Sequence, residues 1–251
     1  MNTRIIVNEF AKMRHLRIGL LAFILFAGIA GITAFRGLAS GLTTHLDDPA
    51  GFGWKILLAG LGFSAGLISP LIIAVIASRQ VEAEHAGNGW LLSAVSGVTP
   101  GRLCRAKFVS LGIIITASTV VQSLILVGVG LGVGISSPLP TGQWIGYTIA
   151  IVVVNLAVLA LHLLLSAKIE NQLACMGIAV IGLFIAVFGS ALPVWMASLT
   201  PWGYYALAAP ADYIGTDLVY LDIPYASILV LALVGAALFY LITARFDRRE
   251  V

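Results

Sequence analysis

The sequence predicts an all-α membrane protein with six transmembrane helices, an amphipathic helix before the first of them, and both termini in the cytoplasm. Of its 251 residues, 60% are hydrophobic and only 10% are charged, and the mean hydropathy is +1.04. Soluble domains carry about 25% charged residues and cannot bury this much apolar surface. The composition excludes a secreted disulfide-rich protein and a disordered one, and a net charge of +3 is too small to indicate a nucleic-acid partner.

Residues 1–17 predict an amphipathic helix along the cytoplasmic surface of the membrane. Ile6, Phe10 and Met13 recur at the spacing of one helix face. Charged residues cover the rest of this segment: Glu9, Lys12, Arg14 and Arg17. A helix divided in this way lies in the interface and does not cross the bilayer.

Six later segments are long and apolar enough to cross a bilayer, which needs about 20 residues in a helix. None contains an internal Asp, Glu, Lys or Arg. They must be helical, because backbone polar groups in lipid have no water to bond. The predicted spans are Ile18–Phe35, Ile56–Ser78, Phe108–Gly134, Trp144–Ala167, Leu173–Ser190 and Tyr225–Thr243.

The basic residues predict the orientation. Of the 14 Lys and Arg residues, all but Arg36 and Lys55 lie on the side that holds both chain ends. Cytoplasmic loops are enriched in Lys and Arg, so both termini are expected in the cytoplasm, and a membrane-impermeant thiol reagent should reach Cys104 only from that side. We see no internal repeat, and residues 1–251 are expected to form one six-span domain.

Several chemistries are missing from the chain. No Lys follows the glycines of a G-x-x-x-x-G-K phosphate loop, so ATP and Mg would have to be held by a partner, and no cofactor or metal site is expected here. His162 is the sole ionisable candidate within the spans, and it fits a hydrogen-bonded side chain better than a proton carrier. This pattern argues against an ion-coupled carrier without excluding one.

The segment Gly62-Phe63-Ser64-Ala65-Gly66 fits the G-x-S-x-G pattern of serine hydrolases. A nucleophilic serine needs a base within hydrogen-bonding distance, whereas helix rise places Ser64 and His162 roughly 15 Å apart in depth. Helix packing through Gly62 and Gly66 is the favoured interpretation. Gly128, Gly130, Gly132 and Gly134 form two further overlapping G-x-x-x-G pairs. They pack helices within the subunit, form the contact with a second subunit, or loosen the end of the helix for gating.

The first cytoplasmic loop, residues 79–107, carries a resemblance to a known family. The stretch Glu84-His85-Ala86-Gly87-Asn88-Gly89-Trp90, followed by Pro100 and Lys107, resembles E-[HK]-x-G-N-x-W…P…K. That pattern follows the second span in ABC-type export permeases of the lantibiotic-immunity and bacitracin-resistance group, whose layout this chain also shares. Ser93–Gly97 departs from it, because those permeases often have a Lys-rich turn after the Trp.

The resemblance implies that this loop forms a coupling helix that seats in a groove of a separate ATPase subunit, with the short loop Lys168–Gln172 as a second contact. The residues expected at the ATPase are Glu82, Glu84, His85, Gly87, Asn88, Trp90, Pro100, Lys107, Lys168 and Glu170.

Polar residues within the spans and aromatic residues outside them are candidates for a substrate route. Gln122 and Asn155 lie near mid-membrane, where they line a translocation path or hydrogen-bond between helices. The outer segment, residues 191–224, is rich in aromatic residues, including Trp195, Trp202 and Tyr205. It also holds Asp212, Asp217 and Asp222. These residues form an interfacial belt with a solvated acidic loop, or an outer gate for amphiphiles.

These observations predict the transmembrane subunit of an ATP-driven exporter in a bacterial cell membrane, paired with a second permease chain of the same or a different kind. The resemblance implies an amphiphilic substrate such as an antimicrobial peptide, a drug or a lipid. Two alternatives stay open: a membrane-anchoring or regulatory subunit, and an ion-coupled secondary carrier.

Overall fold

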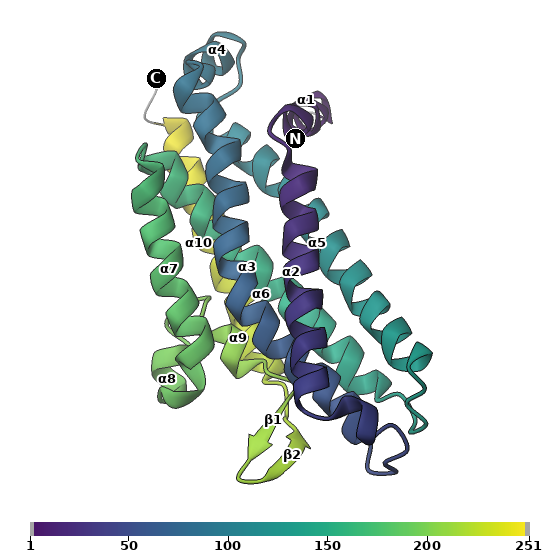
Figure 1. The fold of residues 1–251 in the computed structure, drawn as a ribbon. Coiled ribbons are helices and arrows are strands. Elements are labelled where there is room, and N and C mark those ends of the chain that lie inside the picture. Colours follow the sequence, from purple (N-terminus) through teal and green to yellow (C-terminus); the bar gives the residue numbers. More distant parts are fainter. Residues whose placement is uncertain (1–2, 249–251) are drawn as a thin grey trace.

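Six long helices run side by side through the molecule (Figure 1). The computed structural model describes residues 3–248, so Arg249, one of the cations behind the predicted orientation, lies outside the described residues. Within that range, six helices are long and apolar enough to span a membrane, which confirms the predicted all-α fold. They are α2 (Ile18–Ala39), α3 (Phe52–Ala86), α5 (Pro100–Gly132), α6 (Thr141–Lys168), α7 (Gln172–Phe188, continued by the 3-10 turn η2, Gly189–Ala191) and α10 (Tyr225–Arg248).

Helix α3 is the centre of the bundle. In its most apolar stretch 72% of the residues are buried, against 17% in α10 and 22% in α2. Small residues let neighbours approach it closely, as expected where lipid supplies no hydrophobic force between helices. A Cβ on Gly62 would lie 3.0 Å from Pro210, and one on Gly66 would lie 3.5 Å from Tyr205 Cβ.

The serine of the G-x-S-x-G segment takes part in this packing. Ser64 is buried, its Oγ donates to Gly60 O at 2.6 Å, and it accepts from Thr33 Oγ1 at 3.2 Å. The His162 ring instead lies against Trp202, with the ring centroids 5.7 Å apart. The segment therefore packs helices together and does not pair a serine with a histidine base.

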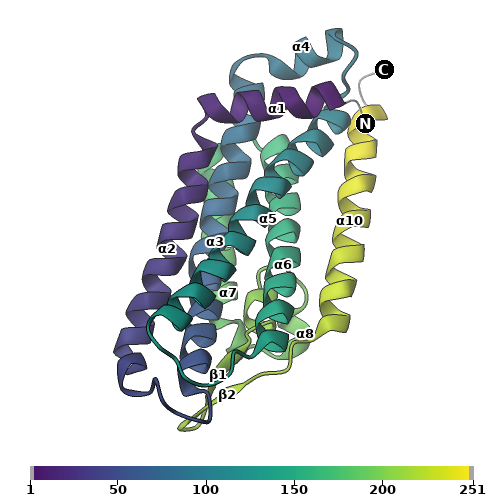
Figure 2. The same cartoon turned by 90° about the vertical axis from the view of Figure 1, so that its right-hand side faces the viewer.

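The two ends of the bundle differ. Helix α1 (Thr3–His15) lies across one end of the spans, and α4 (Gly89–Val95) lies at the same end (Figure 2). Arg17, with φ of 55°, makes the bend between α1 and α2. We call this the basic end; it also holds the last turn of α10. The predicted interfacial helix is thus present as a helix separate from the first span.

The opposite end, here the hairpin end, carries two strands that the sequence did not predict. β1 (Ala211–Ile214) pairs antiparallel with β2 (Asp217–Tyr220), with Ala211 opposite Tyr220. Gly215, at φ of 66°, supplies the left-handed turn between them. The 3-10 turn η1 (Leu42–Thr44) and two short helices complete this end: α8 (Val194–Ala197) and α9 (Tyr204–Leu207).

The segment 79–107, which connects the second and third predicted spans, is mostly helical, and it contains α4 where the resemblance implies a coupling helix. Helix α3 continues past the predicted span end at Ser78 to Ala86, and α5 begins at Pro100 rather than at Phe108. Proline suits the first turn of a helix, where its missing N–H costs nothing. Only residues 87–88 and 96–99 lie between helices here.

Candidate functional site

Helix α4 presents an apolar surface at the basic end. None of its residues is buried, and Leu91, Leu92 and Val95 are 65%, 64% and 82% exposed. We call these three residues the α4 patch. Helices this short are marginal in water, so α4 depends on its attachments to the bundle. A short helix that exposes leucine and valine beyond the spans is suited to bind another protein.

The turn into α4 rests directly on Glu84. Asn88 adopts the left-handed conformation at φ of 51°, and α4 begins at Gly89. A Cβ on Gly89 would collide with the Glu84 carboxylate, so glycine is required for the turn to approach this closely. The position of α4 is therefore tied to the position of the Glu84 side chain.

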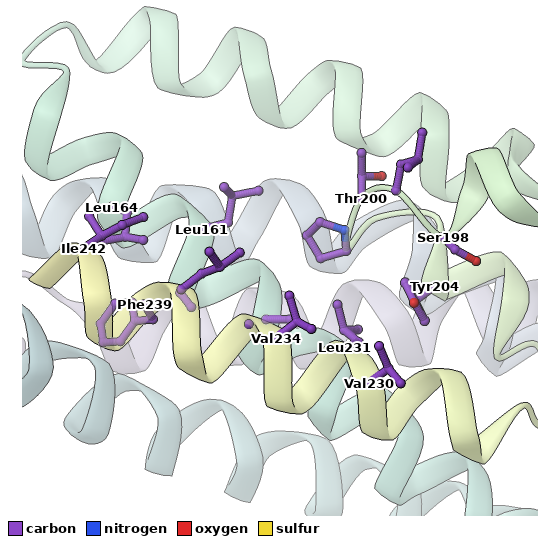
Figure 3. A pocket seen from close by; sticks show the side chains of 16 residues that line it. Leu161, Leu164, Ser198, Thr200, Tyr204, Val230, Leu231, Val234, Phe239 and Ile242 are labelled. Atoms are coloured by element: carbon purple, nitrogen blue, oxygen red, sulfur yellow. The ribbon is translucent and has the colours of Figure 1, made fainter.

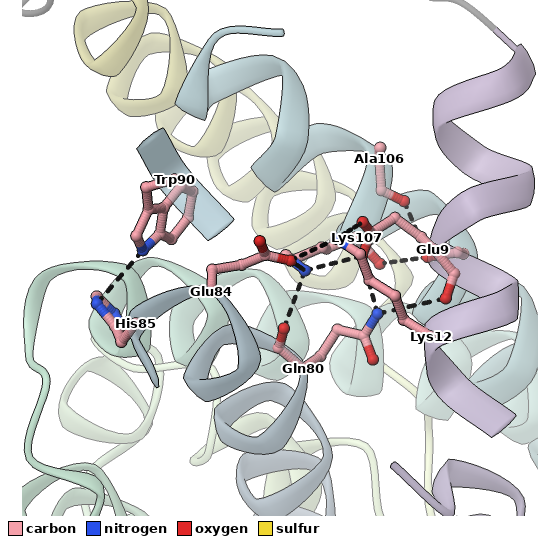
Figure 4. A network of polar contacts seen from close by, with 9 residues as sticks. Glu9, Lys12, Gln80, Glu84, His85, Trp90, Ala106 and Lys107 are labelled. Atoms are coloured by element: carbon pink, nitrogen blue, oxygen red, sulfur yellow. Dashed lines mark hydrogen bonds and ion pairs between the residues drawn. The ribbon is translucent and has the colours of Figure 1, made fainter. Parts of the chain in front are cut away.

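Glu84 belongs to a group of charged and polar side chains beneath α4, which we call the charge cluster: Glu9, Lys12, Gln80, Glu84 and Lys107 (Figure 4). All of them are buried except Lys12, whose side chain is 38% exposed. The Lys107 ammonium donates to Glu84 Oε1 at 2.7 Å, to Glu9 Oε2 at 2.8 Å and to Gln80 O at 2.9 Å. All three of its protons are thus bonded, as a fully buried lysine requires. Gln80 Nε2 also donates to Glu9 Oε2 at 2.9 Å.

Lys12 balances the charge of the cluster. Its Nζ lies 2.6 Å from Glu84 Oε1 and 2.8 Å from Glu9 Oε1, so two carboxylates face two ammonium groups. Burial disfavours the charged form of Lys12, but its hydrogen bonds to Glu84 and Glu9 outweigh burial and raise its pKa above the ordinary value. The cluster joins α1, α3 and α5 at the point on which α4 rests.

A cleft of about 500 Å³ lies beside the cluster, between α1 and α4. Its lining combines charged and apolar side chains, including Glu9, Lys12, Glu84 and Leu92. The cleft adjoins the α4 patch, because Leu92 belongs to both.

His85 connects α4 to a second element. Trp90 Nε1 donates to His85 Nδ1 at 3.3 Å (Figure 4). His85 Nε2 lies 3.1 Å from Ser166 O near the end of α6. The turn that follows, between α6 and α7, carries the exposed side chains of Lys168 and Glu170. Asn171 begins α7 by accepting from Leu173 N at 2.9 Å.

The expected ATPase-facing residues fall into three groups. Glu82, Gly87, Asn88, Lys168 and Glu170 are exposed. Glu84, Pro100 and Lys107 are buried within the chain, and Glu84 lies against the turn that begins α4. His85 and Trp90 are half-buried and are hydrogen-bonded to each other. Sequence reasoning missed Glu9, Lys12 and Gln80 as members of the site, having assigned Glu9 and Lys12 to a solvated face. The sequence does indicate two of them, because Glu9 and Lys12 are opposite charges at i and i+3 on a membrane-surface helix.

Two of the proposed pathway residues come together between the helices, and a third reaches them. Gln122 and Asn155 both line a cavity of about 20 Å³ between α2, α3, α5 and α6. Tyr205 Oη donates to Asn155 Oδ1 at 2.6 Å, and Asn155 Nδ2 donates to Thr119 Oγ1 at 3.1 Å. Asn155 therefore bonds between helices and also fixes the outer segment.

The other two expected pathway residues lie elsewhere. Trp195 on α8 is 67% exposed, and Trp202 packs on His162. A larger apolar cavity, of about 270 Å³, lies between α6, α10 and the turn 198–201 (Figure 3). Leu161, Val234 and Phe239 line it, Ser198 and Thr200 border it, and none of the described residues that line it is charged.

The glycines of α5 divide between two faces. A Cβ on Gly130 would collide with Trp54, so this residue packs within the chain. Gly128 and Gly132 are exposed, with nothing within 4 Å of a Cβ at either position. Cys104 also departs from expectation: it is 1% exposed, so a thiol reagent cannot report on its side of the membrane.

Comparison with known families decides the classification. A model of the ABC-2 family transporter protein (ABC2_membrane_4) matches residues 5–186, which is most of the chain. The chain belongs to the ABC-2 transporter family. No curated protein matches it. ABC-2 permeases are transmembrane domains without a nucleotide-binding site, and they generally work with an ABC ATPase subunit in a bilayer. This ABC-2 permease is accordingly a multi-pass membrane protein and the transmembrane part of an ABC transporter.

Proposed function

We propose that this ABC-2 permease is the membrane subunit of an ATP-driven exporter of amphiphilic molecules, and that the α4 patch binds its ATPase. The observation that carries this proposal is the combination of three exposed apolar side chains on α4 with a buried charge cluster directly beneath them. The α4 patch would supply apolar area for binding, and the charge cluster would hold α4 in place through Glu84. The exposed turn with Lys168 and Glu170 would make the second contact.

The coupling would run from the ATPase to the spans through this base. ATP and Mg would be bound by the ATPase, and the permease itself would hold no cofactor. Closure of the ATPase pair would displace α4, and Glu84 would pass that displacement to α1 and α5 through Glu9, Lys12 and Lys107. Packed elements with fixed contacts shift as units, so a small movement of α4 would reorient whole helices.

The basic end would face the cytoplasm of a bacterial cell, with both termini inside. The distribution of Lys and Arg supports this orientation, because within residues 3–248 only Arg36 and Lys55 lie toward the hairpin end. The exposed carboxylates of Asp212, Asp217 and Asp222 would then face outward, where they would attract cationic cargo. The resemblance to the lantibiotic-immunity and bacitracin-resistance group fits such a cargo.

The cavities support an amphiphilic substrate. The space between α6 and α10 is apolar and uncharged, which suits a hydrocarbon chain or an apolar side chain. A second permease chain would complete the route. The exposed Gly128 and Gly132 on α5 would allow its close approach.

Affinity capture with two variants of the α4 patch and one matched control tests the docking step. Leu91→Asp and Val95→Asp place a charge in the α4 patch, whereas Ile214→Asp places one on a residue of the hairpin end that is 64% exposed. The two α4 variants should no longer capture the ATPase, since burying an unpaired charge at an interface is costly. The Ile214→Asp control should still capture it. Retention by all three would contradict docking through α4.

Reconstitution separates the remaining alternatives. Proteoliposomes holding the permease and its ATPase should move a cationic lantibiotic peptide or bacitracin only when ATP is hydrolysed. A complex that binds the ATPase and moves nothing would support an anchoring or regulatory subunit. Transport by the permease alone, driven by an ion gradient, would support a secondary carrier.

A further inference from the structure

We propose that His85 fixes the spacing between the two segments of the basic end that would contact the ATPase, α4 and the α6–α7 turn. This inference rests on the docking role proposed above for both segments. His85 lies between them: its Nδ1 is 3.3 Å from Trp90 Nε1 on α4, and its Nε2 is 3.1 Å from Ser166 O on α6. Ser166 comes two residues before Lys168, where α6 ends.

The partners of His85 determine which of its nitrogens carries the proton. An indole N–H can only donate, so His85 Nδ1 must accept and is unprotonated. In the neutral ring the proton then sits on Nε2, which donates to the Ser166 carbonyl. Each ring nitrogen is thus used once, and the ring also packs against Trp90, with centroids 5.7 Å apart.

The geometry makes His85 a bridge and not a surface contact. Helix α4 has no buried residue and is only 7 residues long, so its orientation depends on attachments such as the Trp90 hydrogen bond. The same imidazole is bonded to the end of α6, so the two segments keep a fixed spacing. An ATPase that pushes on α4 would therefore move the α6–α7 turn with it. His85 is a positioning residue, because its effect passes through Trp90 and Ser166.

Distance measurement between spin labels tests the bridge in the intact chain without an ATPase. Labels would be attached at Val95→Cys and Glu170→Cys, two exposed positions on the two segments. Both native cysteines are buried, and a sample without added cysteines gives the background. The purified chain in lipid nanodiscs should give one narrow distance distribution. His85→Leu should broaden or shift it, because leucine bonds to neither partner.

Two further variants make the test specific. His85→Gln should keep the narrow distribution, because the amide oxygen accepts from Trp90 and the amide nitrogen donates to Ser166. Trp90→Phe keeps an aromatic ring without the N–H, and it should broaden the distribution as His85→Leu does. Identical distributions in all four chains would overturn the bridge. Equal broadening by His85→Gln and His85→Leu would overturn it as well, since loss of packing would then suffice.

The assembled transporter supplies a second readout. With the ATPase present, His85→Leu should hydrolyse ATP but move about threefold fewer peptide molecules per ATP, and His85→Gln should restore the ratio. If the unaltered chain binds no ATPase, the proposed docking fails, whereas the label distances still decide whether His85 joins the two segments. Normal coupling in His85→Leu would contradict the bridge while leaving docking intact.

Discussion

Lys107 Nζ lies 2.7 Å from Glu84 Oε1, and both side chains are almost completely buried, although they are 23 residues apart in the sequence. Lys107 belongs to α5 and Glu84 to α3, so the pair joins the helices that flank α4. Charges removed from water are stable only where each one is paired and hydrogen-bonded, which Glu9 and Lys12 ensure here. This relationship ties α1, α3 and α5 together at the point on which α4 rests.

Removing one charge of the cluster should be strongly destabilising. Lys107→Met leaves the carboxylates of Glu9 and Glu84 with one ammonium partner, and breaking a buried pair in this way costs about 3–5 kcal/mol. Thermal unfolding of the purified protein in detergent measures the loss. Arg102→Met, at an exposed position on the same helix, is the control and should change the midpoint little. Equal midpoints for the two variants would contradict the structural role of the cluster.

The charge cluster should also make the stability of the folded protein depend on pH in the alkaline range. The pKa of Lys12 is raised in the folded chain, so its contribution is fully present below the ordinary lysine value of about 10.4 and is lost as pH rises through the raised pKa. The difference in unfolding midpoint between the unaltered chain and Lys12→Met should therefore hold constant from about pH 7 to pH 10 and shrink above that range. Comparing the two chains cancels the titration of other lysines and tyrosines. A difference that grows with pH would contradict the assignment.

The bond between Tyr205 and Asn155 should hold the outer segment to the bundle. Tyr205→Phe removes the hydroxyl that donates to Asn155 Oδ1 at 2.6 Å, and interhelical hydrogen bonds in membranes are worth about 0.6 to 2 kcal/mol. A double-mutant cycle with Asn155→Leu measures the coupling between the two residues. Strict additivity of the two single changes would show that the bond contributes nothing. Tyr204→Phe provides a neighbouring control on the same short helix.

Topology can be tested at an exposed position of α4, since Cys104 is buried. A cysteine at Val95→Cys should react with a membrane-impermeant thiol reagent only after the cells are opened, because the basic end is expected in the cytoplasm. Ile214→Cys on the hairpin is the matched position at the other end and should react in intact cells. The reverse pattern would invert the orientation and remove the α4 patch from the reach of a cytosolic ATPase.

The sequence determined the spans because their signal is local. Apolar runs of about 20 residues, bounded by Lys, Arg, Gly and Pro, specify helices in lipid regardless of what packs beside them. The separate helix before Ile18 followed from its amphipathic spacing in the same way. The Gly62 and Gly66 pair was also interpreted as packing, and both residues do approach Pro210 and Tyr205 closely.

Only the tertiary structure decided which residues form the site. Glu9 and Lys107 are 98 residues apart, and their pairing depends on how α1 lies across the bundle, which no local pattern encodes. From the sequence, Glu84 and Lys107 were expected at the surface that contacts the ATPase. Both are instead buried, and they bond α3 to α5. The same holds for His85, whose hydrogen bond to Ser166 spans 81 residues of sequence. Periodicity records which face of a helix is apolar, whereas the partners of a polar side chain are set by helix packing.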